Sequence, residues 1–158
     1  MSLQIDTQAS GNATRVSISG VIDENADFAP LLALEGNVEV NLRGVKRINS
    51  FGAREWMDAV RKLCDTANPN FVEISPAIVD QLNMIQGFLG HATIRSFCAP
   101  LVCPHCDAEE TRVFNTRDCL DIDVAIPITE CPSCARNMVL DDVDDKYLLF
   151  LREPTLVA

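Results

Sequence analysis

Residues 38–65 read VEVNLRGVKRINSFGAREWMDAVRKLCD, and they predict a strand, a tight turn and a helix in immediate succession. Apolar and polar residues alternate from Val38 to Leu42, which is the period of a strand with one buried face. From Ala53 the apolar residues recur at steps of three and four instead, which is the period of an amphipathic helix. The sequence Asn49-Ser50-Phe51-Gly52 makes the turn between them. We therefore expect a core strand that runs directly into the clearest helix of the chain.

The flanking segments continue this alternation of strands and helices. We expect strands at about residues 3–7, 14–21, 71–74 and 93–97. We expect helices at about residues 25–34, capped by Asp23, and from Ser75-Pro76 to Gly90. Strands that alternate with helices need crossover connections, so the predicted fold class is α/β, with a mixed β-sheet packed with α-helices.

Four cysteines form two pairs with the same spacing, Cys103-Pro104-His105-Cys106 and Cys131-Pro132-Ser133-Cys134. Two residues between cysteines let a tight turn aim both sulfur atoms at one point, and two such turns complete the tetrahedral four-thiolate site that zinc prefers. We therefore predict one structural zinc ion bound by Cys103, Cys106, Cys131 and Cys134. An iron–sulfur or redox role is the alternative, and disulfides are a minority interpretation in a chain without an export signal.

The region around these pairs predicts a small module that is stabilised by metal. The segment between the pairs suits a β-hairpin, because residues 112–114 and 123–126 are strand-like. We expect a first domain over residues 1–99 and a zinc-ribbon-like module over residues 100–158, which ends in an acidic segment and a short terminal helix. The apolar residues 147–151 of that helix would pack on the chain's own domain or, alternatively, dock a partner. We interpret His105 as a solvent-facing loop residue. The three cysteines outside the two pairs are interpreted as buried or incidental thiols: Cys64, Cys98 and Cys119.

The chain has a net charge of −10, and its acidic excess is greatest in residues 100–158. Proteins that bind nucleic acid usually carry a basic patch, because neutralising phosphate charges supplies most of the non-specific affinity. A nucleic-acid-binding ribbon is therefore the least favoured function. No apolar run reaches the ~18 residues of a membrane span, and residues 1–20 lack the pattern of a signal peptide. We expect a cytoplasmic protein with no membrane span.

The order of elements in residues 1–99, with the turn Asn49-Ser50-Phe51-Gly52, resembles the STAS family, the fold of anti-sigma-factor antagonists. The family pattern at this turn is Asp-Ser-(Ser or Ala)-Gly. Ser50 falls at the position of the serine that a partner kinase phosphorylates in phosphorylated members, and Gly52 also matches. Asn49 stands where the family usually has Asp, and Phe51 replaces a small residue and puts an aromatic ring where a partner would meet it.

Ser50 therefore has two interpretations. A serine or asparagine before a helix is the usual N-cap, which accepts a hydrogen bond from an otherwise unpaired backbone N–H. Alternatively, a phosphate on Ser50 would meet free N–H groups at the helix start and would add about −1.5 to −2 charges to a binding surface. The expected partner-binding residues around it are Asn49, Phe51, Gly52, Arg47 and Arg54, of which the two arginines could pair with a phosphate or with an acidic partner.

The sequence contains no Gly-rich phosphate loop, no Gly-x-Ser-x-Gly elbow and no histidine within a nucleophile motif, so we do not expect an enzyme. We expect a regulatory protein-binding module, and the resemblance implies an anti-sigma factor or a related serine kinase as its partner. A non-switching adaptor or scaffold subunit of a larger assembly is the alternative. The sequence leaves the oligomeric state open, a homo-oligomer included.

Overall fold

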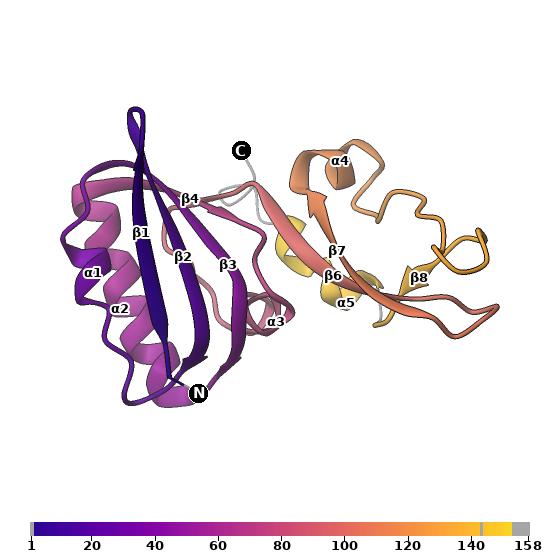
Figure 1. Ribbon diagram of the computed structural model, residues 1–158, viewed down its shortest axis with the longest axis horizontal. Helices are drawn as coiled ribbons and strands as arrows, with labels where there is room; N and C mark the ends of the chain where they lie inside the picture. The colour runs from indigo at the N-terminus through magenta and orange to yellow at the C-terminus, as the bar shows by residue number, and fades with distance from the viewer. Residues whose placement is uncertain (1, 143, 153–158) are drawn as a thin grey trace.

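The computed structural model describes residues 2–142 and 144–152, and Figure 1 shows two β-sheets that lie side by side. The first sheet has five strands in the order β1-β2-β3-β4-β5. β1 and β2 are antiparallel, whereas β2, β3, β4 and β5 are parallel neighbours. The strands are β1 (Gln4–Ser10), β2 (Ala13–Ile22), β3 (Gly36–Ile48), β4 (Ala67–Val72) and β5 (Thr93–Ile94). The predicted mixed sheet with helices is therefore confirmed.

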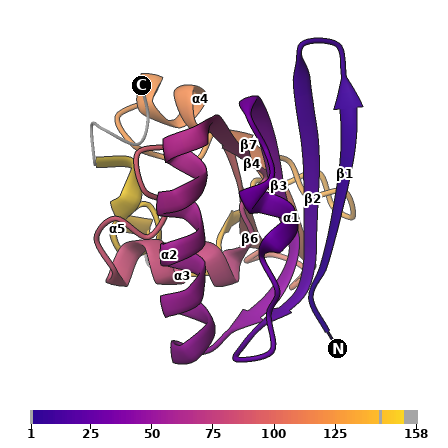
Figure 2. The ribbon, with the colours of Figure 1, turned by 90° about the vertical axis from the view of Figure 1, so that its left-hand side faces the viewer.

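Three helices cover one side of this sheet, as Figure 2 shows. They are α1 (Ala29–Leu32), α2 (Ser50–Thr66) and α3 (Pro76–Met84). The fully buried ring of Trp56 on α2 lies 5.6 Å from Phe28, 6.0 Å from Phe71 and 6.3 Å from Phe88, measured between ring centroids. The expected apolar face of the amphipathic helix is thus the centre of the core. No described helix is long and apolar enough to span a membrane.

Two of the expected helices are shorter than their sequence patterns indicate. α1 has only four residues, and its first N–H, that of Ala29, is held by the side chain of Asp27, so the predicted cap at Asp23 was wrong. Asp23 instead accepts a hydrogen bond from the N–H of Asn25 in a turn. α3 stops at Met84, before turns in which Gly87 and Gly90 have positive φ, so Gly90 does not end the helix itself.

The second sheet has three antiparallel strands in the order β7-β6-β8. They are β6 (Ser96–Val102), β7 (Glu109–Asn115) and β8 (Val139–Leu140), and the short helix α4 (Thr116–Asp121) follows β7. The expected strand at residues 123–126 was wrong, because Asp123 and Val124 have φ of 63° and 58°, which interrupts an extended chain. The hairpin forms between β6 and β7, with the first cysteine pair at its turn.

Strand β6 runs through Ala99 and Pro100, where the boundary between residues 1–99 and 100–158 was expected. A parallel bridge between Ile74, two residues after β4, and Phe97 holds the start of β6 against the first half, and one continuous hydrophobic core extends across both sheets. The two halves therefore share a hydrophobic core, and independent folding of each half stays a prediction.

The end of the described chain returns to the first half of the molecule. It forms α5 (Asp144–Tyr147) and the 3-10 helix η1 (Leu149–Arg152), which together supply the expected terminal helix. The Asn83 amide donates to the carbonyl oxygens of Lys146 and Tyr147 and accepts from the N–H of Phe150. The Tyr147 hydroxyl donates to the Cys98 carbonyl over 2.7 Å, and the Phe150 ring packs 5.3 Å from that of Phe97. We call these contacts the C-terminal clasp.

Candidate metal centre

The first cysteine pair lies in the tight turn between β6 and β7. The Cys103 N–H donates to the Ala108 carbonyl over 2.8 Å, and the Asp107 N–H donates to the Cys103 carbonyl over 2.9 Å. Asp107 closes the turn with a φ of 62°, in the left-handed region that L-residues seldom adopt. Cys103 is buried, whereas Cys106 and His105 are exposed. The turn therefore brings one buried and one exposed cysteine to the same point.

The second pair repeats this geometry. The Cys131 N–H donates to the Arg136 carbonyl over 2.7 Å, and the Ala135 N–H donates to the Cys131 carbonyl over 2.9 Å. Ala135, one residue after the second cysteine, has a φ of 64°. A bridge between Glu130 and Asn137 closes the base of the turn, which then leads into β8. The two turns are equivalent knuckles, which supply two sulfur atoms each.

The four sulfur atoms come together at one point. Cys103 Sγ lies 3.5 Å from Cys134 Sγ, and Cys106 Sγ lies 3.6 Å from Cys131 Sγ. The ligand atoms of all four cysteines lie within 4.8 Å of one another, and no cysteine is in a disulfide. Zinc–sulfur bonds of about 2.3 Å place the sulfurs of a tetrahedral site roughly 3.8 Å apart. The cluster therefore has the dimensions of a four-sulfur metal site.

The backbone around the cluster favours thiolates at two of the four positions. Burial raises the pKa of the Cys103 thiol, but the N–H groups of His105 and Cys106 more than offset it and lower that pKa to about 7. Burial likewise opposes ionisation of Cys131, while the N–H groups of Cys134 and Ser133 lower its pKa. Because metal ligands must be deprotonated, the knuckles prepare the cluster for a cation.

Side chains outside the cluster link the two knuckles. Nδ1 of His105 lies 3.1 Å from the guanidinium of Arg136, so the histidine faces the opposite knuckle and is not among the clustered ligands. Arg112 on β7 pairs with Glu110 and reaches the Glu130 carbonyl ahead of the second knuckle. Within the described residues, no other group of three or more Cys, His, Asp or Glu side chains has metal-binding geometry. Four sulfurs without a further ligand leave no coordination position for a substrate.

The second predicted site lies at the start of α2, on the other half of the molecule. Asn49, not Ser50, is the N-cap: its Oδ1 accepts the Gly52 N–H over 2.8 Å, and its Nδ2 donates to Glu24 over 2.8 Å. The hydrogen bond from the Asn49 side chain lowers the pKa of the Glu24 carboxyl. The capping interpretation of Ser50 was therefore wrong, since Ser50 is the first helical residue and its side chain is exposed.

The other predicted residues of this site have different surroundings. Gly52 is buried, and a Cβ there would lie 2.2 Å from the Ile22 carbonyl oxygen, so glycine is needed for close packing of α2 against the end of β2. Phe51 is 65% exposed. Arg47 at the end of β3 and Arg54 on α2 are exposed as well. Among the predicted residues, only Gly52 is withdrawn from the surface.

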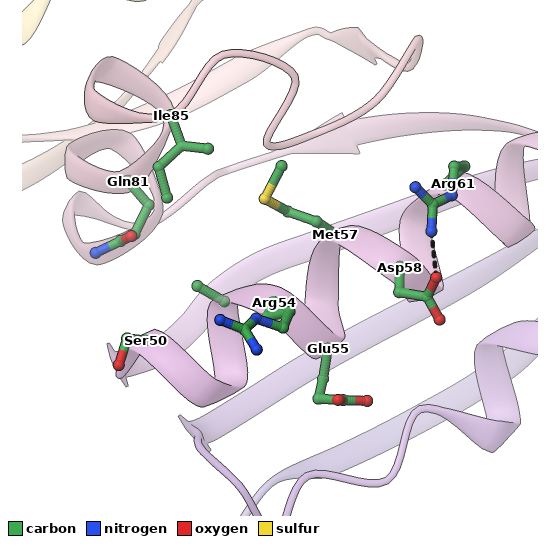
Figure 3. A pocket seen from close by; sticks show the side chains of 9 residues that line it. Ser50, Arg54, Glu55, Met57, Asp58, Arg61, Gln81 and Ile85 are labelled. Carbon is green, nitrogen blue, oxygen red and sulfur yellow. Dashed lines mark hydrogen bonds and ion pairs between the residues drawn. The ribbon is translucent and has the colours of Figure 1, made fainter.

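A hollow of about 680 Å³ lies between α2 and α3, next to this turn. Figure 3 shows Ser50 and Arg54 at its edge, with Met57 of α2 extending towards Ile85 beyond α3. Ser50 and Arg54 thus share one surface, whereas Phe51 and Arg47 do not line it. Sequence analysis missed the residues that come from the α3 side, Gln81 and Ile85, because only the packing of two helices brings them to Arg54. We call this surface the α2–α3 hollow.

A search with protein-family models and a search of curated proteins both find no match to this chain. The site is therefore interpreted from its own geometry.

The left-handed residues of the knuckles give a stability prediction. An L-residue in this region costs roughly 1–2 kcal/mol, a cost that glycine largely avoids. We expect Ala135→Gly to raise the free energy of unfolding of the metal-loaded protein by about 1 kcal/mol, measured by chemical denaturation. The control is Ala59→Gly in α2, where the same exchange should be destabilising by at least roughly 0.5–1 kcal/mol. A loss of stability in Ala135→Gly would contradict the strained geometry.

The helix cap gives a second prediction. Asn49→Ala removes the acceptor for the Gly52 N–H and should lower the free energy of unfolding by about 1 kcal/mol. Ser50→Ala changes an exposed side chain without a capping bond and should stay within about 0.5 kcal/mol of the wild type. Equal losses in both variants, measured by urea denaturation, would show that the cap is wrongly assigned.

Proposed function

We propose that this chain is a non-enzymatic regulatory protein that binds a protein partner at the start of α2, and that its four-cysteine cluster holds a structural zinc ion. The observation that carries the binding role is the exposed Phe51 ring, which follows Ser50, a residue at the edge of the α2–α3 hollow, in the sequence. The STAS resemblance supports the same surface and suggests an anti-sigma factor or a serine kinase as the partner.

Zinc is the metal that best fits the cluster. Four cysteine sulfurs at tetrahedral spacing are the donor set of structural zinc sites, and zinc has no redox chemistry that would disturb them. Cys103, Cys106, Cys131 and Cys134 would each supply one thiolate. When bound, the ion would cross-link the β6–β7 turn to the segment before β8, and its binding free energy would add to folding. An iron centre with the same four ligands is the alternative that metal analysis separates.

The zinc proposal predicts one zinc ion per chain by elemental analysis, and loss of that ion in the double variant Cys103→Ser/Cys131→Ser. Cys64→Ser, a change at a cysteine outside the cluster, should keep the metal. After removal of the metal, hydrogen exchange should accelerate in residues 103–140 and in the C-terminal clasp, because β8 leads into α5. The amides of β2 and β3 should stay protected. Iron in place of zinc, or unchanged exchange in residues 103–140, would contradict the proposal.

The proposed docking surface combines apolar contact with the positive charge of Arg54 and the negative charge of Glu55. Met57, Ile85 and Ala53 supply the apolar part of the α2–α3 hollow, and the exposed ring of Phe51 follows Ser50 at the start of the same helix. On α2, Asp58 forms ion pairs with Arg61 and Lys62. No ion pair involves Arg54 among the described residues, so its guanidinium is available to a carboxylate of the partner. This composition suits an amphipathic segment that carries acidic residues.

A phosphate on Ser50 would act at the edge of the same surface. It would add about −1.5 to −2 charges beside Arg54 and near the Glu24 carboxylate, which reaches Asn49. Arg54 would then be drawn to the phosphate, and an acidic partner would lose its counter-charge. The proposed switch therefore lowers partner affinity.

One observation favours the second candidate, a non-switching adaptor or scaffold subunit. The side chain of Asn49 is occupied as the cap of α2 and as a donor to Glu24. It therefore offers no carboxylate at the position where phosphorylated members of the STAS family have one. An adaptor would use Phe51 and the α2–α3 hollow for binding without any modification of Ser50.

The binding role is tested with a partner captured from the native host by the wild-type chain and then purified. We expect Phe51→Ala to weaken its binding more than tenfold, as for an aromatic anchor at an interface. Leu32→Ala, at another exposed apolar residue, is the matched control and should bind as the wild type does. Equal affinity of the Phe51→Ala, Leu32→Ala and wild-type chains, measured by titration calorimetry, would contradict the docking surface.

The same titrations separate the switch from the adaptor. Ser50→Asp should weaken binding by about 1–3 kcal/mol if charge at the helix start opposes the partner. Ser50→Ala should bind normally, and Thr111→Asp on β7 controls for added negative charge elsewhere. If Ser50→Asp binds as tightly as Thr111→Asp, the adaptor replaces the switch.

A further inference from the structure

Strand β1 forms one edge of the five-stranded sheet, and its outer side is free. No described segment other than β2 pairs with it, and Figure 2 shows β1 at the right-hand margin of the molecule. All residues of β1 are exposed except Ile5, which is half-buried. A row of unpaired N–H and C=O groups on an exposed edge is a template for another strand.

The register of the β1–β2 hairpin shows which backbone groups face outwards. Gly11 and Asn12 form a two-residue turn in which Gly11 has a φ of 61°, and Ser10 pairs with Ala13 next to it. The pair that flanks a two-residue turn exchanges hydrogen bonds, and such pairs alternate along an antiparallel ladder. The N–H and C=O groups of Ile5, Thr7 and Ala9 therefore point away from β2.

This edge lacks the usual protections against strand pairing. The seven residues QIDTQAS contain no proline and no lysine, and their only charged residue is Asp6. The β1–β2 register has no bulge, whereas the β2–β3 register is shifted at two places. Natural sheets usually block an exposed edge with prolines, charges or bulges. A regular, nearly uncharged edge of this length is suited to pairing.

We propose that β1 is a homodimer interface, in which the β1 strands of two copies of this chain pair in antiparallel fashion about a two-fold axis at Thr7. Thr7 then lies opposite the partner's Thr7, and Ile5 lies opposite the partner's Ala9. All outward N–H and C=O groups of Ile5, Thr7 and Ala9 find partners, on the order of six hydrogen bonds between the copies. A single sheet continues through both molecules.

The side chains of β1 are compatible with this pairing on both faces. On the helix side, the apolar Ile5 meets the partner's Ala9. On the open side, Asp6 meets the partner's Gln8, behind which lies the partner's Arg15, since Gln8 pairs with Arg15 within each chain. No like charges stand opposite each other, so the pairing is electrostatically complementary.

The two neighbouring registers, with the two-fold axis at Asp6 or at Gln8, are less favourable for pairing than the Thr7 register. An axis at Asp6 places the two carboxylates directly opposite each other, which is destabilising. An axis at Gln8 leaves Ile5 opposite the partner's turn residue Gly11 and pairs a shorter stretch. The Thr7 register uses the whole strand, and none of its residues line the α2–α3 hollow, so each copy keeps its docking surface.

Disulfide trapping tests the register directly. In Thr7→Cys the two new thiols lie opposite each other, and mild oxidation with copper–phenanthroline should link them as each thiol gives up one proton and one electron. Ser10→Cys is the matched control, because Ser10 is exposed on the same strand but lies opposite the partner's Gln4. We expect rapid covalent dimer formation in metal-loaded Thr7→Cys and only wild-type background in Ser10→Cys. Trapping of Thr7→Cys no faster than that of Ser10→Cys would overturn the proposal.

Sedimentation equilibrium tests the dimer without a crosslink. From about 1 µM to about 1 mM, a range that covers weak interfaces, the wild-type mass should rise from 17.4 kDa towards twice that value. Thr7→Pro removes only an outward N–H and should stay at the monomer mass while keeping the β1–β2 ladder. If Thr7→Pro fails to fold, Thr7→Lys places two like charges at the axis and should likewise remain monomeric. A wild-type chain that stays at 17.4 kDa throughout would overturn the proposal and leave the edge to a strand of another protein.

Discussion

The convergence of four cysteine sulfurs is the constraint on which the second half of the structure depends. Its sheet is small, since β8 has two residues and, within the part of the chain that the structure describes, pairs only with β6. Two knuckles with the same hydrogen bonds hold their sulfurs at the spacing of a tetrahedral metal site. The second knuckle also fixes where the chain turns back, because β8 follows it at once. The place where the sulfurs meet therefore determines where β8 begins beside β6.

Strand β6 connects the four-cysteine cluster to the first half of the molecule. One end of β6 is bridged to Ile74, two residues after β4, and the other end leads into the first knuckle. The C-terminal clasp is a second connection between the two halves. In it, the side chain of Asn83 on α3 forms hydrogen bonds with the backbone of α5 and η1. Gln81, two residues earlier on α3, lines the α2–α3 hollow. The four-cysteine cluster and the α2–α3 hollow are thus joined by a contiguous series of packed elements, although they lie on opposite halves of the molecule.

The sequence predicted what depends on local periodicity and spacing. The helix α2 and the pairing of Cys103, Cys106, Cys131 and Cys134 follow from repeats of a few residues, and the structure contains both. The errors occur where backbone conformation or competition between neighbouring side chains decides the outcome. Asp123 and Val124 have left-handed backbone conformations, so residues 123–126 do not form the strand that their sequence suggested. Asn49 caps α2 in place of Ser50, the residue expected to do so. The α2–α3 hollow and the free edge of β1 depend on tertiary packing and strand order, which the pattern of one segment does not contain.

The turn between β3 and α2 shows how folding and binding requirements can be separated. Asn49 is explained by folding, because it caps α2, and so is Gly52, because a side chain there would collide with the Ile22 carbonyl. Ser50 and Phe51 have no such role, since both side chains are exposed and neither caps the helix. Leaving an aromatic ring 65% exposed gains little hydrophobic stabilisation for the monomer. A partner that covers Phe51 would recover that free energy, so the two residues that folding does not explain are the ones on which binding and its regulation should depend.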